Sequence, residues 1–256
     1  MLDSLAAVEA FHLAFLRAFA RSFSPKVYAL KGGSNLRFFF GSIRYSEDMD
    51  LDVDGPPVFE LKDKAQAILE STGLIGALRP LGIEAIRPPD LARAKQTDTV
   101  QRFKVHLVTT SGEDLATKVE FSRRGMGAPI AAEAVRAEVL RPYRMAPLIV
   151  PHYTAPAAAQ QKLGALAGRK RPEARDVFDL YLLSAFVGDT EPTAGLSADT
   201  LEQARERIYE IDYDDYRDKV VAFLAPEERL HHDSVEMWDE MRLVVVSLIE
   251  GGLRGG

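Results

Sequence analysis

Hydrophobic and polar positions alternate with a period of two over residues 47–54, and this pattern predicts a β-strand. Its two faces are apolar and acidic, with Met49, Leu51 and Val53 on one and Asp48, Asp50 and Asp52 on the other. Acids on one strand face lie roughly 7 Å apart, repel one another and tend to raise one another's pKa. A divalent cation would relieve this repulsion, and oxygen ligands favour Mg²⁺ or Mn²⁺. An exposed edge strand protected by charge would show the same pattern.

The stretch before this strand predicts a strand, a tight turn and a helix. Residues 27–30 form a short apolar run, Gly32 and Gly33 end it, and Ser34 is a suitable N-cap for a helix over residues 35–40. Free backbone N–H groups at such a junction attract anions, and two glycines let a phosphate approach the backbone closely. The junction therefore predicts an anion-binding turn.

Several further segments of the first 130 residues show helical or strand periodicity. We expect helices over 4–20, 58–71 and 74–78, strands over 83–86, 99–107 and 115–121, and loops over 87–90 and 123–127. The last two strands form a hairpin around Gly112. Lys118 and Glu120 lie on its polar face, so Glu120 joins Asp48 and Asp50 if the hairpin pairs with the acidic strand. Exposure on an edge strand explains Lys118 and Glu120 equally well.

Four prolines between residues 141 and 156 exclude a helix through that segment and predict a domain boundary there. The two predicted domains are residues 1–145, an α/β domain, and residues 146–256, an all-helical domain. Helical spacing covers 155–168, 174–181, 198–209, 213–224 and 233–249. His231 and His232 are expected in a loop, and the glycine-rich C-terminus is expected to be disordered.

Two helices of the second domain carry charged side chains among packing residues. Lys162 lies on a stripe of small and apolar residues, so it needs an anionic partner or must extend its ammonium to solvent. Asp176 and Asp179 are three residues apart and share a helix face. Arg175 and Asp179 could instead form a surface ion pair.

Composition limits the classes of function. The chain has 256 residues, 46% of them hydrophobic, which is enough for one large or two smaller cores. It contains no cysteine, which excludes disulfides, thiolate metal sites and a cysteine nucleophile. The net charge of −6 argues against non-specific coating of nucleic acid, although a local basic patch can still bind RNA. The N-terminus resembles no secretion signal and no segment suggests a membrane span, so we expect a cytoplasmic protein.

Four ordered motifs together resemble the AbiEii/AbiGii toxin family, a branch of the polymerase-beta-like nucleotidyltransferases. The first motif combines Lys31-Gly32-Gly33-Ser34 with Arg44-Tyr45-Ser46-Glu47-Asp48-Met49-Asp50. The second is Lys118-Val119-Glu120, the third runs from Gln161 to Arg169, and the fourth is Arg175-Asp176-Val177-Phe178-Asp179-Leu180-Tyr181. Two departures are visible: Glu120 stands where many relatives have aspartate, and residues 157–160 lack the glutamate that relatives usually carry there.

The resemblance implies a nucleotidyltransferase-fold mixed sheet flanked by helices, followed by an all-helical C-terminal domain, with the site in the cleft between them. The implied nucleotide-binding residues are Lys31, Gly32, Gly33 and Ser34. The implied metal ligands are Asp48, Asp50 and Glu120, whereas Asp52 and Asp54 lie outside the motif and are expected on the surface. The implied catalytic residues are Asp48, Asp50, Lys162 and one or both of Asp176 and Asp179, with Lys162 neutralising the phosphates.

The implied reaction is transfer of a nucleoside monophosphate from an NTP to an RNA acceptor, the 3′ end of tRNA in some relatives, with Mg²⁺ or Mn²⁺. The implied setting is a toxin–antitoxin pair with a cognate antitoxin protein. Two other classes stay open. The same site could modify a protein hydroxyl, as an NMP-transferase or a phosphotransferase kinase, or the chain could bind nucleotide or a partner without catalysis.

Overall fold

The computed structural model describes residues 2–89, 97–188 and 191–255. The chain divides into two compact units. The sheet unit comprises Met1–Phe39 and Tyr45–His152, and the helical unit comprises Phe40–Arg44 and Tyr153–Gly256. Within the described ranges, no helix combines the length and the apolar character needed to cross a membrane.

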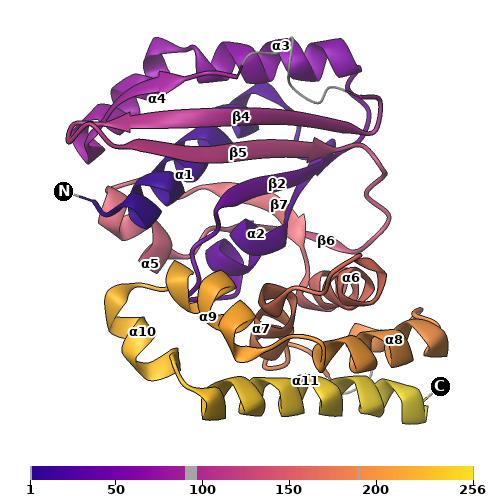
Figure 1. The fold of residues 1–256 in the computed structure, drawn as a ribbon. Coiled ribbons are helices and arrows are strands. Elements are labelled where there is room, and N and C mark those ends of the chain that lie inside the picture. Colours follow the sequence, from indigo (N-terminus) through magenta and orange to yellow (C-terminus); the bar gives the residue numbers. More distant parts are fainter. Residues whose placement is uncertain (1, 90–96, 189–190, 256) are drawn as a thin grey trace. The chain divides into compact units, whose positions relative to one another are not determined.

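Seven strands of the described chain form one mixed sheet in the order β3-β4-β5-β2-β1-β7-β6 (Figure 1). β1 runs antiparallel to β2, β2 runs parallel to β5, and β4 runs antiparallel to both β3 and β5. The strands are β1 Tyr28–Lys31, β2 Asp48–Val53, β3 Ile83–Arg87, β4 Val100–Thr109, β5 Asp114–Ser122, β6 Ile130–Ala134 and β7 Ile149–Tyr153. The predicted acidic strand, the hairpin and their pairing are confirmed, and so is the α/β fold class.

Aromatic side chains of the first helix cover one face of this sheet. The Phe19 ring stacks on Phe121 of β5 with 5.2 Å between centroids and meets Tyr28 of β1 edge-on at 5.1 Å. Because Phe121 is in register with Leu51 of β2, the apolar face of the acidic strand belongs to this core. The helices of the sheet unit are α1 Ser4–Ser22, α2 Gly32–Phe39, α3 Val58–Leu69, α4 Thr72–Leu78, η1 Arg79–Leu81, α5 Ala137–Leu140 and η2 Arg141–Tyr143.

The helical unit packs around its own apolar core. Trp238 and Tyr216 are fully buried and their rings stack with centroids 4.8 Å apart. Its helices are α6 Ala155–Gly168, α7 Ala174–Leu183, η3 Glu191–Thr193, α8 Ala198–Ile208, α9 Tyr213–Lys219, η4 Val221–Phe223, α10 Pro226–His232 and α11 Val235–Gly255. The helical character predicted for this part of the chain is confirmed.

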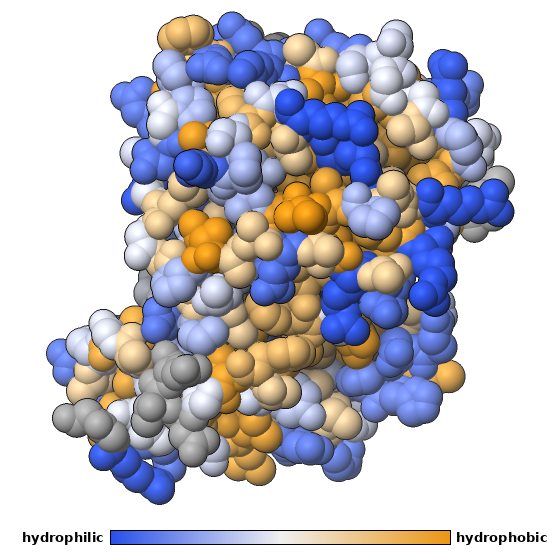
Figure 2. Space-filling view, turned by 180° about the vertical axis from the view of Figure 1, so that it is seen from behind, coloured by the Kyte–Doolittle hydropathy of each residue, from blue (hydrophilic) through white to orange (hydrophobic). Residues whose placement is uncertain are grey.

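Apolar as well as polar side chains reach the surface of the molecule. Figure 2 shows hydrophilic and hydrophobic residues interspersed over the face that is seen from behind. The exposed large hydrophobic side chains include Phe59, Ile149, Leu230 and Leu243. They come from separate elements of both units, and single exposed hydrophobic residues are normal on globular proteins. These residues by themselves therefore do not indicate a binding site.

Four local expectations were wrong. Helix α2 begins at Gly32, so Ser34 lies inside the helix and does not cap it. The helix predicted over 213–224 ends at Lys219 and is followed by η4. His231 and His232 lie in α10, where Pro226 has the fixed φ that suits a first helical residue.

The C-terminal glycines are helical up to Gly255 rather than disordered. An ion pair four residues apart, between Glu250 and Arg254, stabilises this last part of α11. Residue 256 lies outside the described residues, as does residue 90, the end of the loop expected over 87–90; Arg87 of that loop belongs to β3.

The contact pattern divides the chain after His152, whereas the prolines placed the boundary at residue 145. The reason is β7, which pairs with β1 through His152 and Leu30. Residues 40–44 are separated from the helical unit by more than one hundred residues of sequence, yet belong to it. No periodicity in the sequence indicates that residues 40–44 belong to the helical unit.

Candidate active site

Charged residues form two rows across the face of the sheet opposite the Phe121 core. The register of the strands aligns Arg102, Glu120, Asp50 and Lys31 in one row across β4, β5, β2 and β1. The next row contains Lys104, Lys118 and Asp48. The structure therefore brings the three predicted metal ligands onto one face of two neighbouring strands.

Three of the four acids near these rows pair with a basic side chain of the sheet unit. Lys118 Nζ lies 2.6 Å from Asp48 Oδ2, Arg102 Nη2 lies 2.6 Å from Glu120 Oε2, and Lys31 Nζ lies 2.6 Å from Asp52 Oδ1. Asp50 forms no ion pair with any other residue that the structure describes. Of these four acids, Asp50 is thus the one whose charge has no directly contacting basic side chain in the described part of the sheet unit.

Asp52 was expected on the surface, and this expectation was wrong. Its side chain is buried against the ammonium of Lys31, which compensates the charge. The same contact occupies Lys31, one of the predicted nucleotide-binding residues. Asp54, in contrast, is exposed as expected.

The surroundings of Asp50 disfavour its charged form. Burial raises the pKa of the Asp50 carboxyl; the charge of Lys118 lowers it, and the neighbouring carboxylates of Glu120 and Asp48 raise it further. The net direction is upward. A cation bound beside Asp50 would reverse this direction, because it favours the carboxylate.

A glycine turn lies directly against Asp50. Gly32 has φ of +68°, a conformation that glycine adopts at low cost. A Cβ atom at this residue would lie 3.0 Å from Asp50 Oδ2, so a side chain would press on the carboxylate. Gly32 also starts α2, and the first N–H groups of a helix have no partner within the helix. The predicted anion-binding turn and the predicted metal ligand are therefore neighbours.

Ser34 has a structural hydrogen bond rather than an exposed hydroxyl. Its side chain is buried, and its Oγ donates to the backbone carbonyl of Asp48 at 3.0 Å. Ser46 Oγ donates to the same carbonyl at 2.7 Å. The Ser34 bond holds the first residue of β2, and with it the Asp48 carboxylate, beside α2, and the Ser46 bond fixes the same carbonyl from the segment before the strand.

The carboxylates do not form a ready-made cage for a metal. Among the residues described, no three or more His, Cys, Asp or Glu side chains gather as metal ligands do. Lys118 and Arg102 hold two of the three candidate carboxylates instead. The oxygen donors still fit Mg²⁺, which proteins usually bind through one or two carboxylates together with water and substrate phosphates.

A buried histidine supports the same strands, although no motif or spacing in the sequence indicates it. His12 is almost fully buried on α1, and burial lowers its pKa to about 4, so it is neutral at pH 7. Thr117 Oγ1 donates to the carbonyl of Glu47 at 2.7 Å and lies 2.8 Å from His12 Nε2. Because the hydroxyl proton is used, we assign the proton of the imidazole to Nε2. The chain of bonds ends one residue before Asp48.

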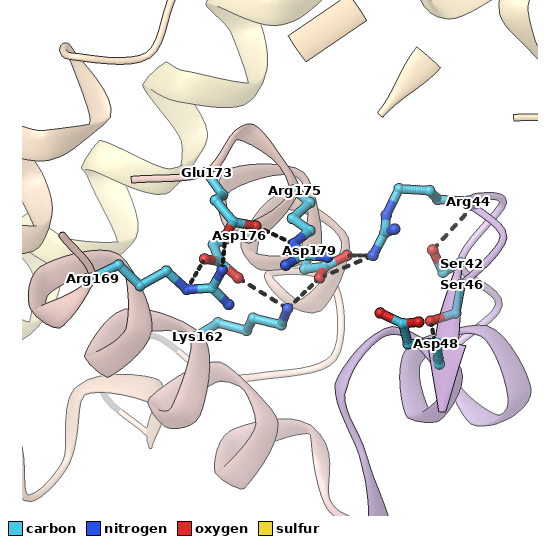
Figure 3. Close-up of polar contacts among 10 residues, drawn as sticks. All are labelled: Ser42, Arg44, Ser46, Asp48, Lys162, Arg169, Glu173, Arg175, Asp176 and Asp179. Carbon is cyan, nitrogen blue, oxygen red and sulfur yellow. Dashed lines mark hydrogen bonds and ion pairs between the residues drawn. The ribbon is translucent and has the colours of Figure 1, made fainter. Parts of the chain in front are cut away.

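In the helical unit, Lys162 lies between two buried aspartates (Figure 3). Its Nζ is 3.0 Å from Asp176 Oδ1 and 2.6 Å from Asp179 Oδ2. The Lys162 side chain is 13% exposed and both aspartates are 0% exposed, so the ammonium does not extend to solvent. Of the two alternatives for Lys162, the structure selects the anionic partner.

Two arginines complete this cluster. Arg44 Nη2 lies 3.4 Å from Asp179 Oδ1, and Arg169 Nε lies 3.2 Å from Asp176 Oδ2. The alternative of a surface ion pair between Arg175 and Asp179 does not hold, because Asp179 is buried and Arg175 pairs with Glu173. The sequence around Arg44 does not indicate this contact, since only the fold brings Arg44 to Asp179.

The pKa shifts within the cluster favour the charged forms of Lys162 and Asp179. Burial opposes the charged form of Lys162, but the charges of Asp179 and Asp176 outweigh it and raise the pKa of Lys162. Burial likewise acts to raise the pKa of Asp179, but the charges of Lys162 and Arg44 outweigh it and lower this pKa. The cluster is therefore an ionised network in which each charge depends on its neighbours.

Solved structures support the fold. The structure of JHP933 from Helicobacter pylori matches with a TM-score of 0.56 and 19% identity, covering 99% of this chain and 94% of that one. A putative nucleotidyltransferase from H. pylori matches with a TM-score of 0.55 and 20% identity over 99% and 97% of the two chains. MenT4, a nucleotidyltransferase toxin from Mycobacterium tuberculosis, matches with a TM-score of 0.58 and 16% identity over 95% and 84%. A comparison with curated proteins finds no match.

The sequence itself matches a family over residues 14–242, which is most of the chain and includes all four motifs. That family is described as the nucleotidyl transferase AbiEii toxin of type IV toxin–antitoxin systems. A toxin of this type implies an NTP substrate and an antitoxin partner. The chain belongs to the AbiEii family and is a nucleotidyltransferase toxin of a type IV toxin–antitoxin system.

Proposed function

We propose that this toxin transfers a nucleoside monophosphate from an NTP to an RNA acceptor, the 3′ end of tRNA, with the help of a divalent cation. The observation that carries the proposal is the carboxylate of Asp50 against the glycine turn of α2, with Asp48 on the same strand face. A cation site and an anion site side by side are what a metal–triphosphate complex requires.

Asp48 and Asp50 would hold Mg²⁺ or Mn²⁺, with Glu120 as a third carboxylate from the neighbouring strand. When bound there, the cation would supply Lewis-acid polarisation of the α-phosphate and a lower pKa for the attacking hydroxyl. Lys118 and Arg102 orient the Asp48 and Glu120 carboxylates through ion pairs. Both side chains also supply positive charge on the face where negative charge builds up during transfer.

The turn at Gly32 and Gly33 would bind the triphosphate through backbone N–H groups at the start of α2. Ser34 and Lys31 contribute to this turn indirectly, because their polar atoms contact Asp48 and Asp52. Ser34 fixes the strand that carries the metal ligands. Lys31 adds one positive charge in the same row as Asp50.

A basic surface in the helical unit supports a polyanionic acceptor. Lys170 and Arg171 are exposed, and together with Arg169 and Glu173 they line a hollow of about 680 Å³. Arg169 and Glu173 pair with each other, whereas Lys170 and Arg171 form no ion pair with another described residue. These two side chains are available for phosphate contacts.

The test is an incubation with NTPs labelled at the α-phosphate, with total RNA or total protein as the acceptor. We expect label in a tRNA-sized RNA fraction, and none after addition of EDTA. Label in protein would reject RNA as the acceptor. A parallel reaction with γ-labelled NTP separates this chemistry from a kinase, since only a kinase would transfer that label.

Matched variants locate the reaction on the sheet. Asp48→Asn and Asp50→Asn should each abolish transfer, because each removes a charged ligand while keeping the side-chain size. Asp54→Asn is the control: it changes an exposed aspartate beyond the end of β2 and should retain activity. Wild-type turnover in both site variants would refute the proposed metal site.

A further inference from the structure

A second concave site lies in the sheet unit, between α1, α3, α4 and residues 143–145. Its volume is about 730 Å³, which is within the usual size range of small-molecule sites. Its lining shares no residue with the predicted active site. Apolar side chains make up most of the wall, including Ala14, Ala18, Ala67, Ile68, Leu74 and Met145.

The charged residues that line this pocket are all basic. They are Arg17, Arg21, Lys64 and Arg144, and the lining contains no Asp or Glu. Lys64 is partly compensated, since its Nζ lies 2.9 Å from Glu60 Oε1. Arg21 and Arg144 form no ion pair with any residue in the described part of the chain. The lining of the pocket is therefore positively charged, although the chain carries a net charge of −6.

Hydrogen bonds to the backbone hold two of these cations in place. The Arg17 guanidinium donates to the carbonyls of Ala146 and Pro147, which ties α1 to the segment after η2. Lys64 Nζ donates to the carbonyl of Ser22 at 3.3 Å, which ties α3 to the end of α1. The walls are therefore joined at two points, and the pocket does not require a ligand to form.

Arg17 and Arg21 are four residues apart on α1 and so share a helix face, where like charges repel. Burial, followed by the charge of Arg21, lowers the pKa of Arg17. Arg144 has φ of +51° and is the single non-glycine residue in the described ranges with positive φ. Such a backbone conformation is uncommon for arginine, and residues in uncommon conformations are often found at functional sites. The pocket wall formed by Arg144 is therefore a candidate binding surface.

We propose that this pocket binds a small amphipathic anion, a phosphate, sulfonate or carboxylate joined to an apolar ring or chain. The apolar body would lie against the alanine, isoleucine and leucine side chains, and the anionic group would pair with Arg21 and Arg144. Binding of the anion would relieve the repulsion between Arg17 and Arg21 on α1. This relief would explain why the lining of the pocket carries an excess of positive charge. This site is separate from the NTP site, and the inference does not depend on the proposed reaction.

The first experiment uses 8-anilinonaphthalene-1-sulfonate, an apolar ring system with one sulfonate, whose fluorescence rises on binding. We expect one saturable site per chain in the wild-type protein. The variants Arg21→Gln and Arg144→Gln should each weaken binding about tenfold, the effect of removing one charged hydrogen bond. Arg124→Gln, an exposed arginine outside the pocket, is the matched control and should bind like the wild type.

Two further measurements keep the test sharp. Ala77→Trp introduces a large side chain at the pocket wall and should abolish the saturable site without loss of the thermal transition, because residue 77 is exposed on α4. The neutral analogue N-phenyl-1-naphthylamine should bind much more weakly than the sulfonate. Equal binding of both probes, or unchanged affinity in both arginine variants, would overturn the proposal.

Competition identifies the source of the anion. Octyl phosphate below its micellar concentration should displace the probe and raise the melting temperature, as a ligand of the native state does. Displacement by phosphatidylglycerol vesicles but not by monomeric octyl phosphate would overturn the proposal of an enclosed small ligand in favour of a membrane surface.

Discussion

Replacing Lys162 by methionine tests the buried charge cluster of the helical unit. The ammonium contacts Asp176 at 3.0 Å and Asp179 at 2.6 Å, and both carboxylates are 0% exposed. Removing one partner of a buried ion pair usually costs about 3–5 kcal/mol, because a buried charge is left uncompensated. Arg44 and Arg169 still contact the two aspartates, so we expect the lower end, about 3 kcal/mol. For a chain of this size this loss corresponds to a fall in Tm of roughly 6–12 °C.

The pH dependence of this loss follows from the pKa directions. The wild-type cluster lowers the pKa of Asp179, so its contribution is present above the unfolded pKa of about 3.9 and is lost as the pH falls through the folded pKa. The raised pKa of Lys162 means that its contribution is lost only at alkaline pH. Without Lys162, burial favours the protonated form of Asp179. The deficit of the variant should therefore be larger at about pH 7.5 than at about pH 5.

Thermal melting at these two pH values measures the effect, with Lys170→Met as the exposed-lysine control. A second substitution, Asp179→Asn in the Lys162→Met background, should recover part of the missing stability. Single-turnover transfer is measured in parallel, because removing the predicted phosphate contact of Lys162 would cost roughly 10²–10³ in rate. An unchanged Tm at both pH values would refute the buried cluster, and an unchanged rate per folded molecule would refute the phosphate contact.

Three further changes test other parts of the molecule. Gly32→Ala should reduce transfer strongly, since it strains a residue with φ of +68° and puts a methyl group 3.0 Å from Asp50 Oδ2; activity like that of the wild type would contradict the role of this turn. Reversing the charges of Lys170 and Arg171 should weaken RNA binding and flatten its salt dependence by about one unit of slope for each phosphate that is no longer neutralised; an unchanged slope would place RNA elsewhere. His12→Gln tests the buried histidine. Burial lowers the pKa of His12 to about 4, so the unfolded chain binds this proton first, and the wild type should lose up to about 1.4 kcal/mol of stability per pH unit as the pH falls from 6.5 to 4. The variant should lack this loss, and melting curves against pH would show no difference between the two proteins if His12 were charged in the native state.

The sequence by itself determined the elements and the chemistry of the sheet face. Alternation of apolar and acidic residues predicted β2, the glycine pair predicted the junction between β1 and a helix, and the hairpin pattern put Glu120 on a polar face that joins Asp48 and Asp50 only once the strands pair. Periodicity is a local property, set by the geometry of one strand or helix, so it can be read without the fold. The family resemblance followed from the order of the same local motifs, and the match over residues 14–242 confirmed it.

The partners of the charges were decided by tertiary structure. Nothing near Asp52 in sequence predicts that Lys31 covers it, and Arg44 contacts Asp179 only because residues 40–44 belong to the helical unit. The pattern around Lys162 required an anionic partner or solvent but could not choose between them. Ion pairs depend on distances of a few ångströms between residues far apart in the chain and on how much water the fold excludes around them, and no local period encodes either quantity.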